Sequence, residues 1–239
     1  ACRVLDRRWV NDSNMRVPRF SLPLYAGAVF CRRHPQNFHG VCQTVGMTVE
    51  TAAIAAILAY CLSAGLWVFR QNRGLNIVLP QVFALLALSA HALTHGLYWH
   101  MNHGPDVHFF AALSWTTLAM AAITAVLTAQ RPLSALGILV YPIAALSLLA
   151  YWRWGVHITS ALDWRLKLHA SFALLAYASL SIASLIAMLY WLQDRALRRR
   201  NLQGWLGALP PLVQTEQLLF KTLGASWLLL TLTLVTGLV

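Results

Sequence analysis

Long runs of apolar residues dominate the chain, and short polar breaks separate them. Each run is roughly 20 residues long, the length that a helix needs to cross about 30 Å of hydrocarbon. Strict alternation of apolar and polar positions, which is typical of membrane β-barrels, is absent from the sequence. The predicted fold is therefore an all-α, polytopic bundle of transmembrane helices. About six spans are expected, near 49–69, 77–99, 107–128, 133–152, 166–192 and 218–239.

The composition agrees with this pattern. Of 239 residues, 59% are hydrophobic and only 10% are charged, whereas soluble domains carry about 25% charged residues. These values exclude a water-soluble globular enzyme, and they also exclude a disordered chain, which needs low hydrophobicity and high charge. The sequence contains no P-loop, G-x-S-x-G or Gly-rich dinucleotide pattern. We therefore expect a membrane protein that is not an enzyme.

Basic residues outnumber acidic ones, 18 to 7, and they cluster at the ends of the apolar runs. Clustering of this kind is the positive-inside signature of membrane proteins rather than a nucleic-acid-binding face. If the loop after the first span is cytoplasmic, eight basic residues lie inside and three outside. This assignment predicts that the loops 100–106 and 153–165 face outward, and we expect the membrane to be a bacterial inner (plasma) membrane. The other long loop is expected over 193–217.

Residues 1–46 do not fit the span pattern, because they lack a strong apolar run and contain seven Arg and two Asp. Met47 directly precedes the first clean span. We therefore predict that 1–46 is an extension outside the domain, from a mis-assigned start, and that 47–239 is the transmembrane domain. The final apolar run stops without a polar flank, which predicts that the natural chain continues past Val239.

Histidine is the informative residue type within the spans, because an ionisable group inside a membrane is costly and marks a functional site by default. His91 and His95 share one helix face at i, i+4 spacing. Counted from the outer ends of the spans, His95 lies roughly 6 Å deep, His91 roughly 12 Å and His169 roughly 5 Å. Imidazoles from two spans at similar depth suit the axial positions of a b-type haem. Any one of these histidines taken alone is more often structural, bonded to a neighbouring carbonyl, than a ligand.

Several neighbouring residues extend this hypothesis. Thr94, Ser89 and Ser171 are candidates to orient an imidazole through its second nitrogen. One of the outer basic residues, Arg153, Arg165 and Lys167, is a candidate to pair with a haem propionate. Aromatic residues gather at the outer ends of the spans, as an interfacial belt or as a platform for a flat macrocycle. A zinc or copper site on the i, i+4 pair is poorly supported, because no H-E-x-x-H motif or nearby carboxylate accompanies it.

From Met47 onward the chain resembles the transmembrane cytochrome c assembly family (CcsA/CcmC-like), in its short branch without a large soluble domain. The resemblance is carried by SAHALTH around His91, by LKLHASFALLAYASLSIASLIAMLYWLQDRALRRR around His169, and by LPPLVQTEQLLFKTLGASWLLLTLTLVTG between Leu209 and Gly237. It implies a haem-handling protein with His91 and His169 as iron ligands. Depth alone favours His95 in place of His91. The implied partners are haem, other cytochrome c maturation proteins and apocytochrome c, besides the lipid bilayer.

The chain departs from the family pattern in one respect. Haem-presenting members carry an outer-loop motif of the form W-G-x-x-W-x-W-D, and here only Trp152–Gly155 and Asp163-Trp164 are faintly similar. Two other functions therefore stay open. One is an accessory or regulatory membrane protein without a cofactor, whose histidines are structural. The other is a transporter, which the scarcity of intramembrane carboxylates disfavours.

Overall fold

Six helices make up the computed structural model, which describes residues 38–73, 76–102, 104, 106, 108–130, 134–155, 163–198 and 211–238. Each helix contains a segment that is long and apolar enough to cross a membrane. The predicted all-α, six-span architecture is confirmed. The helices are α1 (Phe38–Arg73), α2 (Val78–Asn102), α3 (Phe109–Gln130), α4 (Ser134–Trp154), α5 (Trp164–Arg198) and α6 (Leu212–Leu238).

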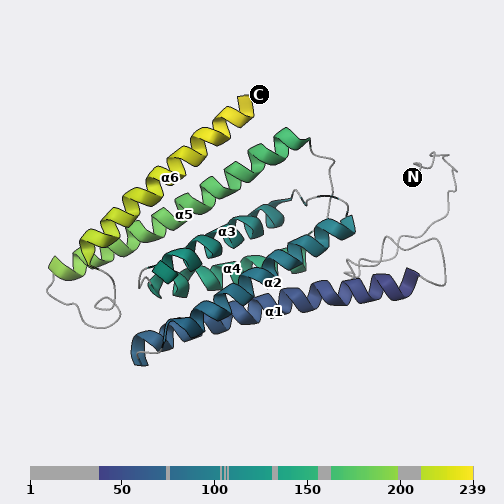
Figure 1. The fold of residues 1–239 in the computed structure, drawn as a ribbon, viewed down its shortest axis with the longest axis horizontal. Helices are drawn as coiled ribbons and strands as arrows, with labels where there is room; N and C mark the ends of the chain where they lie inside the picture. The colour runs from purple at the N-terminus through teal and green to yellow at the C-terminus, as the bar shows by residue number, and fades with distance from the viewer. Residues whose placement is uncertain are drawn as a thin grey trace, which may run out of the picture.

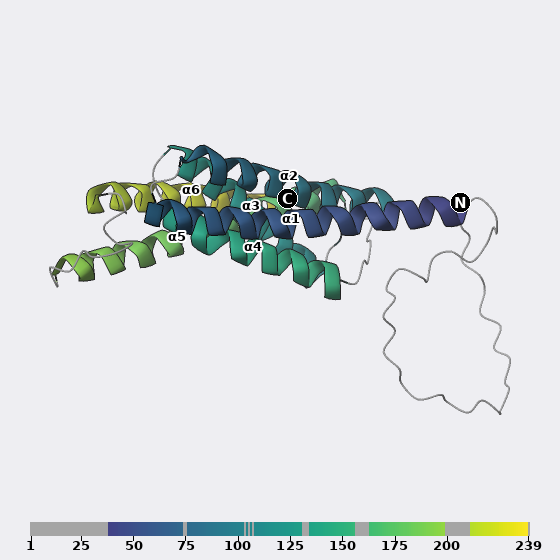
Figure 2. The same cartoon turned by 90° about the horizontal axis from the view of Figure 1, so that it is seen from below.

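The helices form two groups that meet at α3. Helix α1 packs on α2 and α4, and α3 packs on α4 and α2, so these four helices close on one another. Helix α5 packs on α3, and α6 lies along α5 (Figure 1). The view at right angles shows α1 extending past its neighbours at its N-terminal end (Figure 2). We call the end of the bundle that holds Asn102, Phe109, Trp154 and Trp164 the outer end, because the charge pattern predicts that it faces outward.

Polar residues and prolines at the breaks fix where several helices begin. The Asn76 side-chain oxygen accepts the Val78 N–H at 3.2 Å, directly before α2. The Asp163 carboxylate likewise accepts the Trp164 N–H at 2.8 Å, at the start of α5. Short polar side chains cap helix N-termini by satisfying N–H groups that have no partner within the helix. The polar residues in the breaks between the apolar runs therefore locate these two helix starts.

One predicted loop differs from the structure, and one helix begins inside the segment predicted to lie outside the domain. The predicted loop 193–217 is shorter, because α5 continues to Arg198 and α6 begins at Leu212. Polar residues end the apolar span but not the helix, and Arg198 donates to Asp194 one turn earlier at 2.9 Å. Helix α1 begins at Phe38, upstream of Met47, while the rest of the predicted extension, residues 1–37, lies outside the described residues.

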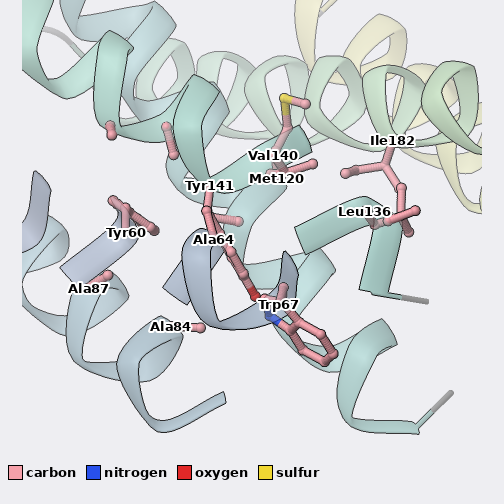
Figure 3. Close-up of a cluster of buried hydrophobic side chains, with 14 of the residues drawn as sticks. Tyr60, Ala64, Trp67, Ala84, Ala87, Met120, Leu136, Val140, Tyr141 and Ile182 are labelled. Carbon is pink, nitrogen blue, oxygen red and sulfur yellow. The ribbon is translucent and has the colours of Figure 1, made fainter. Parts of the chain in front are cut away.

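Large aromatic side chains and alanines fill the core between the helices (Figure 3). Tyr60 and Trp67 of α1 and Tyr141 of α4 have no exposed surface. The rings of Tyr60 and Tyr141 stack with their centroids 5.9 Å apart. Ala84 and Ala87 are the buried residues with which α2 meets them, and such small side chains let transmembrane helices approach closely. This packing holds α1, α2 and α4 around the site described next.

Candidate functional site

His91 and His95 lie one turn apart on α2 and both point into the bundle. His91 has no exposed surface and His95 is 3% exposed. Their rings are nearly parallel, with centroids 5.3 Å apart and an angle of 21° between the planes. The i, i+4 spacing thus places both imidazoles on one face, as predicted, and this face is directed at α1 and α3.

Hydrogen bonds from two other helices hold these imidazoles. The Ser114 hydroxyl oxygen on α3 lies 2.9 Å from His91 Nε2 and 3.0 Å from His95 Nε2. The Tyr60 hydroxyl oxygen on α1 lies 3.2 Å from His91 Nδ1. A hydroxyl has one proton, so Ser114 donates to one of the histidines and accepts from the other. The two neutral imidazoles consequently hold opposite tautomers with respect to Nε2.

Aromatic rings enclose His95 from α3 and α4. Its ring stacks on Trp115 at a centroid distance of 4.2 Å and on Tyr151 at 4.8 Å. The Tyr151 hydroxyl in turn donates to the Asp106 carboxylate. Trp115 and Tyr151, two of the aromatic residues gathered at the outer end, therefore pack around the His95 imidazole. Other members stay largely exposed, as an interfacial belt requires: Trp99, Phe109, Trp154 and Trp164.

His169 lies near the start of α5 and is half-buried against α6. Its Nδ1 lies 3.0 Å from the backbone carbonyl oxygen of Thr233. A carbonyl oxygen only accepts, so Nδ1 carries the proton of the neutral ring and Nε2 carries the lone pair. In the described part of the chain, Nε2 makes no hydrogen bond and is not sealed from the surface. Histidines that bind metals through Nε2 commonly donate Nδ1–H to a backbone carbonyl in this way.

The structure brings His91 and His95 together, but it does not bring His169 to either of them. Helix α2 packs on α1 and α3, whereas α5 packs on α3 and α6. Among the described residues, no hydrogen bond or ring contact joins His169 to the α2 histidines. Ligation of one haem iron by His91 and His169 together therefore stays a prediction, and it requires the two histidines to move toward each other.

The remaining histidines of the outer end have other positions. His100 is exposed at the end of α2. His108 precedes α3, and its Nδ1 accepts the Ala111 N–H at 2.9 Å, as a helix cap does. His103 and His157 lie outside the described residues.

The donor atoms decide which of these residues fits a haem iron. The Ser114 hydroxyl is hydrogen-bonded to Nε2 of both α2 histidines. Because the two imidazole rings stack on the same helix face, they cannot lie on opposite sides of one macrocycle. His169 fits, because a neutral ring that donates Nδ1–H to the Thr233 carbonyl has its lone pair on Nε2. No group of three or more His, Cys, Asp or Glu able to hold a metal ion occurs within the described ranges.

The residues that orient the imidazoles differ from those predicted. The hydroxyls of Thr94, Ser89 and Ser171 each donate to a backbone carbonyl of their own helix. The orienting groups are instead Ser114, Tyr60 and the Thr233 carbonyl, which lie on neighbouring helices. Serine and threonine are common in these spans, and no spacing in the sequence distinguishes those that meet a histidine.

An open apolar groove of about 490 Å³ runs between α1 and α2, away from the histidines. No ionisable side chain lines it, so it offers iron no ligand. Its lining residues are Ala55, Leu58, Ala59, Leu62, Phe83, Leu86, Ser89, Ala90 and Leu93.

Six apolar helices with imidazoles held near one end define a polytopic α-helical membrane protein. Within that class, residues 77–239 match the sequence pattern of the family described as cytochrome C assembly protein. The chain belongs to this family, and the match covers α2 to α6. No curated protein and no solved structure matches the chain.

Proposed function

We propose that this chain handles haem in cytochrome c assembly and holds b-type haem near the outer end of its bundle, with His169 as an axial iron ligand. This proposal rests on the 3.0 Å hydrogen bond from His169 Nδ1 to the Thr233 carbonyl. With the proton on Nδ1, the lone pair of the neutral ring lies on Nε2. The proposed role is to hold haem rather than to turn over a small substrate. The proposed location is a bacterial inner membrane, with apocytochrome c or other maturation proteins as partners.

Residues beside His169 suit the rest of a haem. Arg165 lies one turn closer to the outer end on the same helix face, with its guanidinium carbon 5.7 Å from the centre of the Trp164 ring. Arginine binds carboxylates through paired hydrogen bonds, and we propose that Arg165 would hold a propionate at the membrane surface. The exposed Trp164 ring offers an apolar surface nearby. Haem would supply an iron centre that the His169 imidazole could ligate.

The second axial ligand follows from the family resemblance. His91 was predicted there, with His95 as its substitute. Either residue reaches an iron only after its hydrogen bond to Ser114 opens. We propose that such an opening accompanies haem binding if the ligand pair forms.

An accessory protein without a cofactor is the second candidate, and a specific observation favours it. Both Nε2 atoms of His91 and His95 are hydrogen-bonded, and both rings are buried among aromatic and polar neighbours. Histidines satisfied in this way hold helices together without any ligand.

An absorption spectrum of the detergent-purified chain, oxidised and reduced, distinguishes the two. We expect a haem Soret band in the wild type, its loss in His169→Ala, and no change in His100→Ala, whose side chain is exposed. A shift in His91→Ala identifies the second ligand. Absence of the band from a folded, haem-replete preparation contradicts haem binding and favours the accessory protein.

A further inference from the structure

The last turn of α6 lies against the imidazole of His169. We propose that this turn is a positioning element: the Thr233 carbonyl fixes the proton on Nδ1, and the absence of a side chain at Gly237 lets the ring lie against the helix. Nε2 is then presented in one tautomer and one orientation. The relevance to haem rests on the proposed function, whereas the geometry of the imidazole does not.

Two acceptors flank Nδ1. The Thr233 carbonyl oxygen lies 3.0 Å away and the Thr236 hydroxyl oxygen 3.5 Å away. The Thr236 proton is directed back along its own helix, to the carbonyls of Leu232 at 2.9 Å and Thr233 at 3.0 Å. Thr236 therefore faces His169 with a lone pair. The Thr233 carbonyl oxygen can only accept, so it takes the imidazole proton on Nδ1.

Gly237 makes the close approach of the ring possible. A Cβ atom at this position would lie 3.0 Å from His169 Cε1, 3.2 Å from Nδ1 and 4.0 Å from Nε2. Distances near 3.0 Å are shorter than ordinary van der Waals contacts, so an added methyl group would shift the imidazole by a few tenths of an ångström. The hydrogen bond to Thr233 would lengthen, and the bias toward Nδ1–H would weaken.

The same helix supplies a matched control. A Cβ atom added at Gly224 meets nothing within 4 Å. Gly224→Ala therefore makes the same chemical change in α6 without touching His169. Any effect specific to Gly237→Ala is then due to contact with the imidazole rather than to the helix propensity of alanine.

The first test is nitrogen NMR of histidine-labelled full chain in detergent without haem, with the His169 signals assigned by comparison with His169→Gln. We expect the Nδ1–H tautomer in the wild type and in Gly224→Ala, and a mixture of tautomers in Gly237→Ala. An Nε2–H tautomer in the wild type, or no change in Gly237→Ala, overturns the proposal. Thr236→Val, which keeps the side-chain shape, provides a second variant if Gly237→Ala does not fold, and it should also lower the Nδ1–H fraction.

Haem titration separates this proposal from the proposed function. Residues that orient a metal-bound histidine typically contribute 10- to 100-fold in affinity. We expect a weakening of about tenfold or more in Gly237→Ala and none in Gly224→Ala. Equal affinity in both variants overturns the positioning role. Absence of haem binding from every protein, with the tautomers as expected, overturns the proposed function and leaves the positioning geometry in place.

Discussion

At the residue scale, the Ser114 hydroxyl decides how two buried imidazoles are protonated. It lies about equally far from His91 Nε2 and His95 Nε2, at 2.9 and 3.0 Å. An unpaired polar group inside a membrane protein is costly, because no water reaches it. Ser114 therefore satisfies two nitrogens that α2 alone leaves without partners.

We predict that Ser114→Ala lowers the stability of the protein by about 1–3 kcal/mol, the cost of leaving a buried hydrogen-bonding group unsatisfied. Thermal unfolding in detergent measures the change. Ser181→Ala is the control, because the Ser181 hydroxyl is exposed and donates to Tyr177 in its own helix. If both variants unfold at the same temperature, the shared hydrogen bond carries no stability.

Tyr60 contacts the other nitrogen of His91, and its effect should depend on Ser114. Tyr60→Phe removes the hydroxyl that lies 3.2 Å from His91 Nδ1, and we expect a loss of about 1 kcal/mol. Groups that share a partner give non-additive effects. In a double-mutant cycle of Tyr60→Phe and Ser114→Ala, we therefore expect coupling of about 0.5 kcal/mol or more. Strictly additive losses would show that the two bonds act independently.

At the element scale, two helix glycines differ in what an added methyl group would meet, so they distinguish the effect of close packing from that of helix propensity. A Cβ atom at Gly137 of α4 would lie 2.9 Å from Trp67 Nε1 and 3.1 Å from Tyr141 Cε2. A Cβ atom at Gly96 of α2 meets nothing within 4 Å. Alanine favours a helix over glycine by up to about 1 kcal/mol, whereas overpacking a core costs about 1–3 kcal/mol.

We predict opposite signs for these two substitutions. Gly137→Ala should lower the unfolding temperature, because the core aromatics have to move, and Gly96→Ala should leave it unchanged or raise it. Differential scanning fluorimetry of both variants in the same detergent checks the result. A stabilised Gly137→Ala would mean that Trp67 and Tyr141 move aside at no cost.

At the scale of the whole molecule, the asymmetry of basic residues predicts one orientation in the membrane. Arg153 and Arg198 are both exposed, at opposite ends of the bundle. In a chain whose four cysteines are replaced by serine, we expect Arg153→Cys to react with a membrane-impermeant maleimide in intact cells. Arg198→Cys should react only after lysis. The reverse labelling pattern would place the candidate haem site on the cytoplasmic side.

The whole molecule also separates the histidines into two environments. His91 and His95 lie among α1, α3 and α4, while His169 lies between α5 and α6. Both environments lie toward the outer end of the bundle. Lateral position, which decides whether two imidazoles reach one iron, does not follow from depth.

The sequence by itself determined the spans, because bilayer thickness dictates the length of each apolar run. Its motifs also indicated the family. It also placed His91 and His95 on one face, since helical periodicity fixes i, i+4 neighbours. Which small residues face the protein did not follow from the sequence: Ser179 and Ala183 on α5 are buried, whereas Ala55 on α1 is exposed while its neighbour Ala56 is fully buried.

Only the tertiary structure decided which face of each helix meets protein and which meets lipid. Within a membrane both faces are apolar, so the hydrophobic periodicity that marks the core of a soluble protein is weak. For the same reason the pairing of Ser114 and Tyr60 with His91, and of Thr233 and Gly237 with His169, could not be predicted. These contacts join residues far apart in the chain, and the packing of whole helices sets them.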